Sequence, residues 1–377
     1  MTTMINACKG STGILSVESD TNFRASGTLT VVSGGGKATA SVDHATLSAA
    51  SATVGRGDDQ AVLFMQDGAH FSTSGAVTVG TNGIPDATDP GRLASIGGVL
   101  TVSGPVAVPN ANLAAVLKGA ELDAHGISIG EGGTGSLFVD GNPSRVINTG
   151  TVTVGGAGTG VVSLSNNASL TSSGTVRAES GGTLVGSGDA NGNVVNAGGT
   201  VVPGGSPGVM TISDDYTQLL NSIIMFKIFG PSPSEYHRLF VGGNAVVAGT
   251  LDLAFFFTPA PHTVFELITV GGTGDFSGLT IESNNAEVVA HFNDGVFVVE
   301  VVPEPVTWIL MLTAINLAVL FARCWPKPTS SPGPALVVKP LPRFRPLAFR
   351  LLGWRLKRVL AHGRFSVGVI DAVQPAR

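Results

Sequence analysis

A step of 25 residues runs through the first half of the chain and restricts the folds that it can adopt. Four dipeptides in which Val or Ile precedes Gly keep this step, with separations of 25, 50 and 25 residues: Val54-Gly55, Val79-Gly80, Ile129-Gly130 and Val154-Gly155. Thr101-Val102 is assigned to the missing step. A second set of motifs follows at similar offsets: VLFMQDG from Val62, SLFVDGN from Ser136 and VSLSNNA from Val162. Two sets of markers in phase indicate a structural repeat.

Each repeat contains three short stretches with the pattern of a half-buried strand. Residues 152–154, 161–164 and 168–170 alternate apolar residues with Ser, Thr or their equivalents. Gly-Gly, Asn-Asn and Asp-Gly pairs between them supply corners with positive φ. Three strands and three corners in 25 residues predict one coil of a right-handed parallel β-helix, or β-solenoid, so the predicted fold class is all-β. A β-sandwich or barrel is the alternative, and the constant step disfavours it.

The composition suits a stack of such coils. Glycine accounts for 52 of 377 residues, about twice its average usage, while aromatic residues make up 6% and charged residues 12%. A chain with few large side chains can still bury apolar surface when each layer covers the next.

Changes in the pattern divide the chain. We expect an irregular start over residues 1–25, solenoid repeats over 26–213 with room for seven coils, and a β-rich cap over 214–300. Prolines 85, 90, 105 and 109 interrupt the repeat, so an insertion near 81–117 is predicted to loop out. Aromatic residues concentrate in the cap, where the open last coil would otherwise expose unpaired strand edges.

An apolar run of seventeen residues, 306–322, follows the cap and is predicted to be a single transmembrane helix. Nine of the seventeen are Val, Ile, Leu or Phe, which together favour insertion by about 3 to 5 kcal/mol. The rival interpretation is a buried core helix or a pair of strands. At about 1.5 Å per residue the run reaches about 25 Å, so Arg323 would have to snorkel to the membrane surface.

Charge changes sign at this run. The residues before Arg323 carry 10 Lys or Arg and 25 Asp or Glu, whereas those from Arg323 onward carry 11 basic residues and one acid. An acidic body argues against nucleic acid as a partner. The positive-inside rule places the basic tail, 324–377, in the cytoplasm and the body outside. Part of this tail could form a basic amphipathic helix on the inner leaflet, or it could be unselected sequence.

The order of residues around the apolar run resembles the PEP-CTERM sorting signal of bacterial envelope proteins. Pro303, Glu304 and Pro305 precede the run and Arg323 follows it. The resemblance implies an exported surface protein, with membrane lipid and an exosortase-type transpeptidase as partners. One departure is that 54 residues follow Arg323, whereas such signals usually end the chain. The start lacks a basic and apolar leader, so the true start is expected upstream, or the chain is truncated.

The repeats resemble those shared by bacterial autotransporter passengers and PEP-CTERM proteins, on the motifs GISIGEGGTGSLFVDG at 126 and GTVTVGGAGTGVVSLSNNASL at 150. Residues 192–278 resemble the β-rich end of autotransporter passengers, with His237 where that end usually has an acid. The resemblance implies a solenoid closed by a β-rich cap.

Catalytic and metal-binding patterns are weak throughout. Asp58-Asp59 and Asp214-Asp215 are interpreted as solvated turn acids, and Arg56-Gly57-Asp58 as a coincidence. In the segment GGTGDFSGL at Gly271, the Asp lies one position too early for a calcium-binding repeat, so no calcium site is predicted there. The seven histidines (44, 70, 125, 237, 262, 291 and 362) lack the spacing of metal ligands. The two cysteines, Cys8 and Cys324, are too few for a disulfide framework or a zinc site. No catalytic residue, cofactor or metal is predicted.

The sequence therefore predicts a structural protein of the cell surface or extracellular matrix, not an enzyme. It would display an acidic β-solenoid outside a membrane that it crosses once, with an exopolysaccharide as a further candidate partner. The alternatives are a β-helix enzyme acting on polysaccharide and an adhesin that binds glycans or cells.

Overall fold

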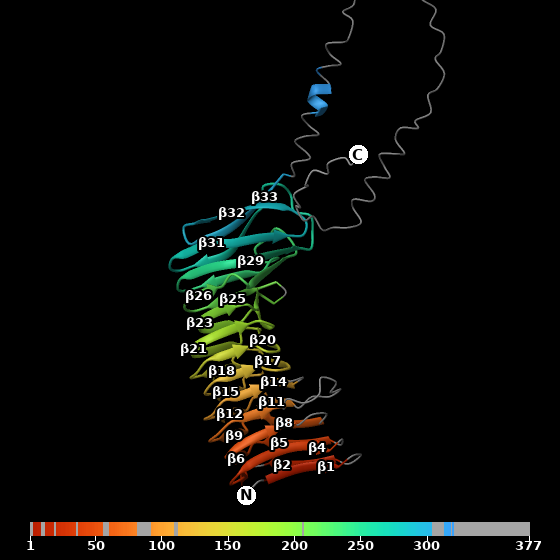
Figure 1. The fold of residues 1–377 in the computed structure, drawn as a ribbon. Helices are drawn as coiled ribbons and strands as arrows, with labels where there is room; N and C mark the ends of the chain where they lie inside the picture. Colours follow the sequence, from red (N-terminus) through yellow and green to blue (C-terminus); the bar gives the residue numbers. More distant parts are fainter. Residues whose placement is uncertain are drawn as a thin grey trace, which may run out of the picture. The chain divides into compact units, whose positions relative to one another are not determined.

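The computed structural model of the chain describes residues 3–8, 12–18, 20–34, 37–55, 60–80, 92–108, 112–205, 207–303, 313–317 and 319. The chain divides into two compact units, Met1–Glu304 and Pro305–Arg377. The first unit is an all-β solenoid, which confirms the predicted fold class at this level (Figure 1). In the second unit, residues 313–317 are helical.

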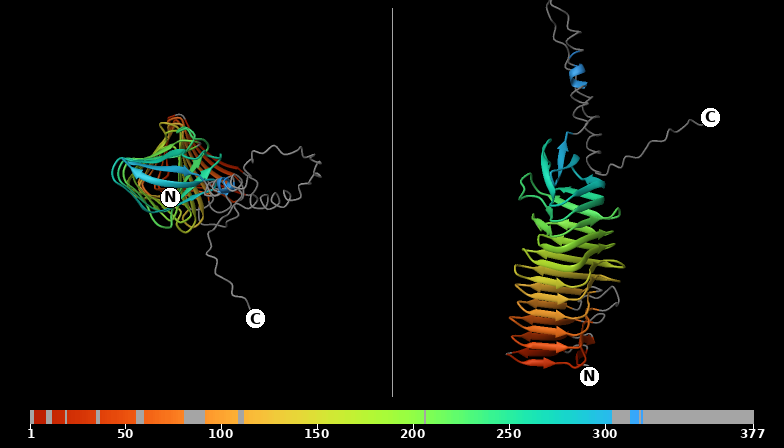
Figure 2. Two further views of the ribbon diagram at one scale, coloured as in Figure 1. Left: turned by 90° about the horizontal axis from the view of Figure 1, so that it is seen from above. Right: turned by 90° about the vertical axis from the view of Figure 1, so that its left-hand side faces the viewer.

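Three parallel ladders of strands form the walls of the solenoid, and the chain visits them in turn (Figure 2). The first ladder contains β1 (Thr3–Cys8), β4 (Thr28–Gly34), β7 (Ser51–Val54), β10 (Val77–Val79), β13 (Val106–Val108), β16 (Ile127–Ile129), β19 (Val152–Val154) and β26 (Tyr216–Gln218). The second contains β2 (Thr12–Glu18), β5 (Lys37–Asp43), β8 (Gln60–Gln66), β11 (Arg92–Ile96), β14 (Asn112–Leu117), β17 (Thr134–Asp140), β20 (Thr159–Ser165), β22 (Gly182–Gly186), β24 (Thr200–Pro203) and β27 (Ile223–Ile228).

The third ladder contains β3 (Asn22–Arg24), β6 (Thr46–Ala49), β9 (His70–Thr73), β12 (Val99–Val102), β15 (Glu121–Ala124), β18 (Arg145–Asn148), β25 (Val209–Ile212), β28 (Arg238–Val241) and β30 (Val264–Val270). Four longer strands turn a corner and so belong to two ladders each: β21 (Ser169–Glu179), β23 (Asp189–Ala197), β29 (Ala245–Phe255) and β31 (Gly274–Ser283).

The direction of pairing changes at the end of the solenoid. β33 (Val296–Val302) pairs antiparallel with β30 on one side and with β32 (Glu287–Asn293) on the other. The parallel stacking that precedes it therefore ends in an antiparallel sheet of three strands.

The sequence markers lie in register, as the repeat predicts. Val54 pairs with Val79 in the first ladder, and Ile129 pairs with Val154. The glycine after each of these residues has a φ between 78° and 85°. At Gly155 a Cβ atom would lie 2.3 Å from the backbone nitrogen of Gly182 in the next coil. Only glycine fits this corner, because both the positive φ and the stacked backbone exclude a side chain.

Four predictions about the repeat and its boundaries are wrong. The start is regular from Thr3, since β1, β2 and β3 pair in parallel with β4, β5 and β6. Thr101 and Val102 belong to the third ladder, whereas Val106–Val108 fill the missing step of the first.

Much of the predicted insertion, 81–117, is also part of the solenoid. Its strands β11 to β14 pair with the coils on both sides. Residues 81–91 and 109–111 of that prediction lie outside the described residues. Parallel stacking also continues past Ser213 to β31, so the solenoid is longer than the seven coils expected.

Inward-facing side chains alternate with outward ones along every ladder and fill the interior. In β20, for example, Val162 and Leu164 are fully buried while Val161 and Ser163 are half-buried on the outer face. This is the period of two expected for strands with one covered face.

Candidate functional site

Of the four residues assigned to the sorting motif, Pro303 is described, and Glu304, Pro305 and Arg323 lie outside the described residues. Pro303 is half-buried and directly follows β33, the last strand of the solenoid unit. Within the described residues, no helix has the length and apolar character needed to cross a membrane. The part of the candidate site that can be examined is therefore the attachment of β33.

β33 is held on both edges immediately before Pro303. It pairs with β30 through Val264 to Thr269 and with β32 along the whole of β32. Two further backbone hydrogen bonds join its end to the preceding turn: His262 N donates to Val301 O (2.7 Å) and Val301 N donates to Thr263 O (2.9 Å). His262 Nδ1 also lies 2.9 Å from Glu300 Oε1. The last strand is thus integrated into the sheet up to its final residues.

Aromatic side chains pack beneath this sheet. Phe265 is fully buried, with ring centroids 5.3 Å from Tyr236, 5.5 Å from Phe255 and 6.5 Å from Phe257. On another part of the cap, Phe276 stacks on Phe297 at 4.5 Å. Burial raises the pKa of the Tyr236 phenol. These large rings fill the interior at this end of the solenoid.

A buried polar network lies in the preceding coils, between β23 and β29, and the sequence analysis did not find it. Tyr216 Oη donates to Gln218 Oε1 (2.8 Å), and Gln218 Nε2 donates to Ala248 O (2.7 Å). Asn196 Nδ2 donates to Ile223 O (2.9 Å), and Ser222 Oγ donates to Asn196 O (2.8 Å). Burial raises the pKa of Tyr216 and keeps its phenol protonated. The detectable signal was Gln218, a polar residue at an inward position of a short strand.

His237 is buried beside this region, at 1% exposure. Burial lowers the pKa of its imidazole to about 4, and the neighbouring Lys227 cation adds to the effect. The ring is therefore neutral at pH 7. Its ring centroid is 6.3 Å from that of Phe229, which itself stacks on Phe256 at 4.8 Å on the surface.

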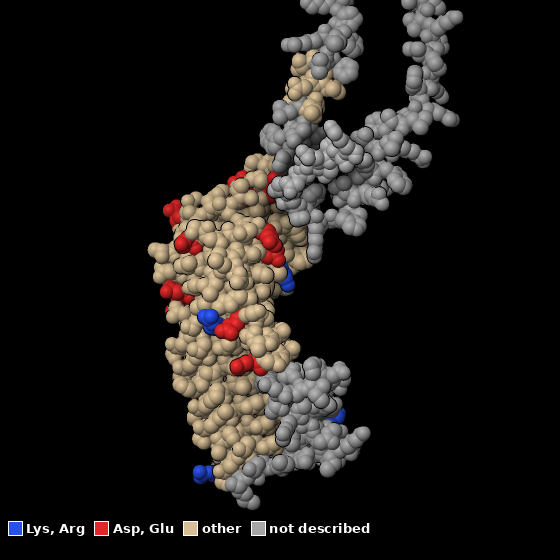
Figure 3. Space-filling view, viewed as in Figure 1, with Lys and Arg blue, Asp and Glu red and all other residues tan. Residues whose placement is uncertain are grey.

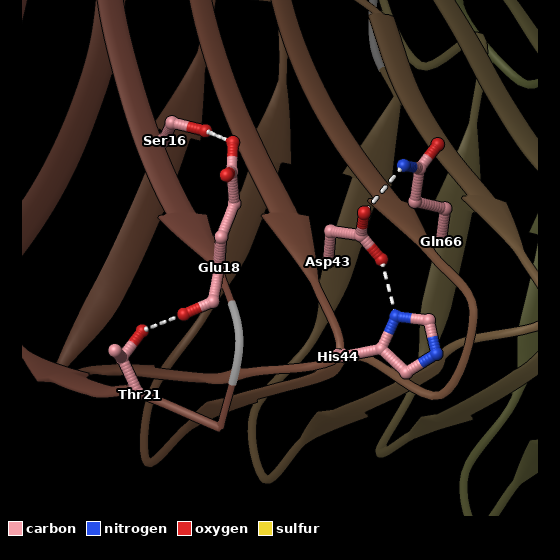
Figure 4. A network of polar contacts seen from close by, with 6 residues as sticks. All are labelled: Ser16, Glu18, Thr21, Asp43, His44 and Gln66. Atoms are coloured by element: carbon pink, nitrogen blue, oxygen red, sulfur yellow. Dashed lines mark hydrogen bonds and ion pairs between the residues drawn. The ribbon is translucent and has the colours of Figure 1, made fainter.

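Polar side chains also link successive coils at the corner between the second and third ladders (Figure 4). Gln66 Nε2 donates to Asp43 Oδ2 (2.9 Å), and His44 Nδ1 lies 2.7 Å from Asp43 Oδ1. These two hydrogen bonds, with Gln66 the larger cause, lower the pKa of the Asp43 carboxyl. In the preceding coil, Ser16 bonds to the Glu18 carboxylate and Thr21 Oγ1 donates to Glu18 O. The Gln66–Asp43 contact joins two successive coils, whereas the other three contacts lie within one coil.

Asp214 and Asp215 lie in a bend, as predicted for turn acids. Asn244 donates to Asp215 Oδ1 through both its backbone nitrogen (2.7 Å) and Nδ2 (3.1 Å), and Asn244 Oδ1 accepts from Thr273 in turn. Asp58-Asp59 and the Arg56-Gly57-Asp58 tripeptide lie outside the described residues. Among the described residues, no three His, Cys, Asp or Glu side chains are close enough to hold a metal ion.

Acidic side chains gather toward the cap. Ten Asp or Glu residues lie between 207 and 303, against the two cations Lys227 and Arg238. On the face in Figure 3 the acids lie over the upper coils, and the described part nearer the N-terminus shows none. The cap is the more strongly negative part of the solenoid.

Two shallow grooves bear on the enzyme hypothesis. One, of about 520 Å³, contains Glu131 and Glu179, which bond to Ser128 and Arg177 respectively at 2.8 Å. The other, of about 470 Å³, contains Asp123 and His125, and His125 Nδ1 lies 2.7 Å from Thr149 Oγ1. Burial raises the pKa of Asp123. Neither groove brings three carboxylates together among its lining residues.

Comparison with known proteins adds no assignment. No protein-family model matches the chain, and no curated protein matches it.

Proposed function

We propose that this chain is an exported structural protein of the bacterial cell surface or extracellular matrix, anchored in the membrane near its C-terminus. The solenoid would wind right-handed, as about 98% of crossovers between parallel strands do. Pro303, Glu304, Pro305 and Arg323 would act as a PEP-CTERM-like sorting signal. The acidic body would lie outside and the basic tail, 324–377, in the cytoplasm.

The observation that best supports this proposal is the way in which the solenoid ends. β33 pairs with β30 up to Glu300 and with β32 up to Val302, and the proposed signal begins at the next residue. A protein displayed through a C-terminal anchor needs its last strand secured in the folded body.

Fractionation of cells that express the full chain tests the proposal. We expect the chain in the envelope pellet, with protease added to intact cells degrading the solenoid. Replacing Leu310 and Leu317 by Glu should move the chain out of the pellet, because each added carboxylate costs about 2.5 to 3.5 kcal/mol at a membrane centre.

Two further variants separate the signal from the anchor. Glu304→Ala should leave the chain in the membrane and change its sorting, whereas Glu287→Ala, which removes an acid of β32, should change neither. Recovery of the unaltered chain from the soluble cytosol would contradict the proposal.

A further inference from the structure

A groove runs along the corner between the first and second ladders of the solenoid, and we call it the corner groove. Its first half is the shallow cavity of about 520 Å³ that contains Glu131 and Glu179. A second cavity, of about 570 Å³, adjoins the first, because Ser180 and Ala197 line both. The lining residues lie in or just after β16, β19, β21, β23 and β26 of five successive coils. At about 4.8 Å per coil, the corner groove extends for about 19 Å.

Three charged side chains line the first half of the corner groove, and hydrogen bonds hold them in place. Ser128 Oγ donates to Glu131 Oε2 (2.8 Å), and Arg177 Nε donates to Glu179 Oε1 (2.8 Å). Glu179 also lies over Gly156 of the preceding coil, where an added Cβ atom would be 3.3 Å from Glu179 Oε2. These contacts use one oxygen of each carboxylate and one nitrogen of the guanidinium. Both kinds of group can form further hydrogen bonds with a ligand.

The second half of the corner groove contains apolar side chains that are open to water. Leu219 is 46% exposed and Leu220 is 74% exposed. Ser180 and Asn221 line the same half and supply groups that can donate and accept hydrogen bonds. A ligand that fills both halves must therefore offer apolar surface and many hydrogen-bonding groups in one molecule.

The charges of the corner groove restrict the charge of its ligand. Glu131 and Glu179 contribute −2 and Arg177 contributes +1, so the lining residues carry a net charge of −1. The two carboxylates would repel a polyanion. A polycation would gain little, because Arg177 already pairs with Glu179 and opposes a second cation. Hydroxyl groups can donate to both carboxylates and accept from the guanidinium, so an uncharged ligand can use all three side chains.

The sugar units of a polysaccharide combine these properties. A pyranose ring has hydroxyl groups around its edge and C–H groups on its faces, so it can bond to the charged half and pack against the leucines. Because the corner groove passes through five coils, several consecutive units of an extended chain can lie along it. A small ligand would contact one half of the groove only.

We infer that the corner groove binds an extended, uncharged polysaccharide chain, with its hydroxyl groups on Glu131, Arg177 and Glu179 and its C–H faces on Leu219 and Leu220. Hydrogen bonds already fix both carboxylates, which reduces the entropy lost on binding. The inference deepens the proposed function, because it names the class of matrix polymer that the displayed body would hold.

Isothermal titration calorimetry of the purified full chain with cellohexaose, an uncharged and extended oligosaccharide, tests the inference. The detergent that keeps the chain in solution must have a headgroup other than a sugar. We expect a Kd on the order of 0.1 to 1 mM, because the groove is shallow. Hexagalacturonate, a polyanion, and hexalysine, a cationic peptide, should each bind at least about 10-fold more weakly.

A variant that fills the groove has a matched control in the same coil. Ser180→Trp places a ring where the two cavities meet and should weaken the binding of cellohexaose at least about 10-fold. Ser173→Trp adds the same ring at a different corner and should change the Kd by less than about 2-fold. Both serines are exposed, and circular dichroism checks that each variant keeps its β structure.

Removing one carboxylate tests the polar contacts. Glu131→Ala should weaken the binding of cellohexaose about 5- to 10-fold, because sugar hydroxyls lose an acceptor. Glu18→Ala is the control: it removes an exposed carboxylate that likewise bonds to a serine, Ser16, but that lies outside the groove. This variant should bind cellohexaose as the unaltered chain does.

Four results would overturn the inference. Cellohexaose could fail to bind at concentrations up to about 5 mM. Ser180→Trp and Ser173→Trp could bind it equally well, or one of the charged probes could bind more tightly than cellohexaose. Cleavage of cellohexaose during the titration would assign the groove to an enzyme instead. Any of these results would leave the proposed membrane anchoring standing, because fractionation of cells does not depend on the groove.

Discussion

The buried side chains of the coils from Thr3 to Pro203 are mostly Ala, Val and Leu, whereas those of the cap after Tyr216 include several aromatic rings. Among the described residues, Phe71 is the one fully buried aromatic side chain before Tyr216. The cap contains four aromatic side chains that are at most 2% exposed: Tyr216, Phe226, Phe255 and Phe265. At the glycine corners of the coils the backbones of successive coils stack closely, whereas in the cap large rings pack against one another in the interior. The two regions should therefore fail under different substitutions.

The largest expected effect is at a corner of the coil. Gly155→Ala should destabilise the solenoid by about 4 kcal/mol or more, because the added Cβ would lie 2.3 Å from Gly182 N in the next coil. Gly68 is the matched control: its φ is 76°, yet nothing lies within 4 Å of an added Cβ. Gly68→Ala should cost only the backbone strain of about 1 to 2 kcal/mol. Equal losses in denaturant titrations would show that stacking contributes nothing at Gly155.

In the cap, removing one ring should have the next largest effect. Phe265→Ala should lower the free energy of unfolding by about 3 to 4 kcal/mol, because a cavity would form among Tyr236, Phe255 and Phe257. Phe256→Ala removes a ring that is 61% exposed and should cost less than about 1 kcal/mol. Thermal unfolding of both variants checks this, and a similar shift for the two would argue against a close-packed cap.

Acid should weaken the cap through His237. The pKa of His237 in the folded state is about 4, below its ordinary value of 6.5, so the unfolded chain binds the proton more tightly. The contribution of His237 to the free energy of unfolding is constant above pH 6.5. It falls by up to about 3 kcal/mol as the pH drops from about 6.5 to about 4. His237→Phe should remove this part of the pH dependence. Parallel stability curves for wild type and variant over this interval would disprove the assignment.

A smaller effect is expected from a buried amide in the coil. Asn148 Oδ1 accepts from Gly126 N (2.7 Å), and its Nδ2 donates to Gly150 O and to Ser172 Oγ. Asn148→Ala should cost about 1 to 3 kcal/mol, because the Gly126 N–H would lose its partner. Ser173→Ala, which removes an exposed contact to Thr149 O, should cost less than about 0.5 kcal/mol. Chemical denaturation measures both.

The 25-residue repeat predicted correctly which strands of the coils pair with each other, except where the intervals between strands vary in length. Alternation and corner glycines placed Val54, Val79, Ile129 and Val154 in one ladder correctly. Between Val79 and Ile129, however, Val108 lies 29 residues after the first and 21 before the second. The longer and shorter intervals compensate, so a constant step of 25 lands on the wrong strand.

Other features had no signal in the pattern. The first two coils use Asp20 and His44, respectively, at positive φ where a glycine would have marked the corner. Strands that alternate apolar and polar residues look the same whether they pair parallel or antiparallel, so the reversal at β33 was not predictable. The residues of the proposed sorting signal were predicted by resemblance, and apart from Pro303 they lie outside the described part of the chain.

The way in which β33 is inserted between two antiparallel neighbours has a mechanical consequence. A pulling force applied at Pro303 along this strand would load its backbone hydrogen bonds to β30 and β32 in shear, many at once. A strand at the free edge of a parallel stack would have neighbours on one side only, and its bonds could open one after another. The pairing of the last strand on both edges therefore lets this end of the solenoid bear tension applied at Pro303.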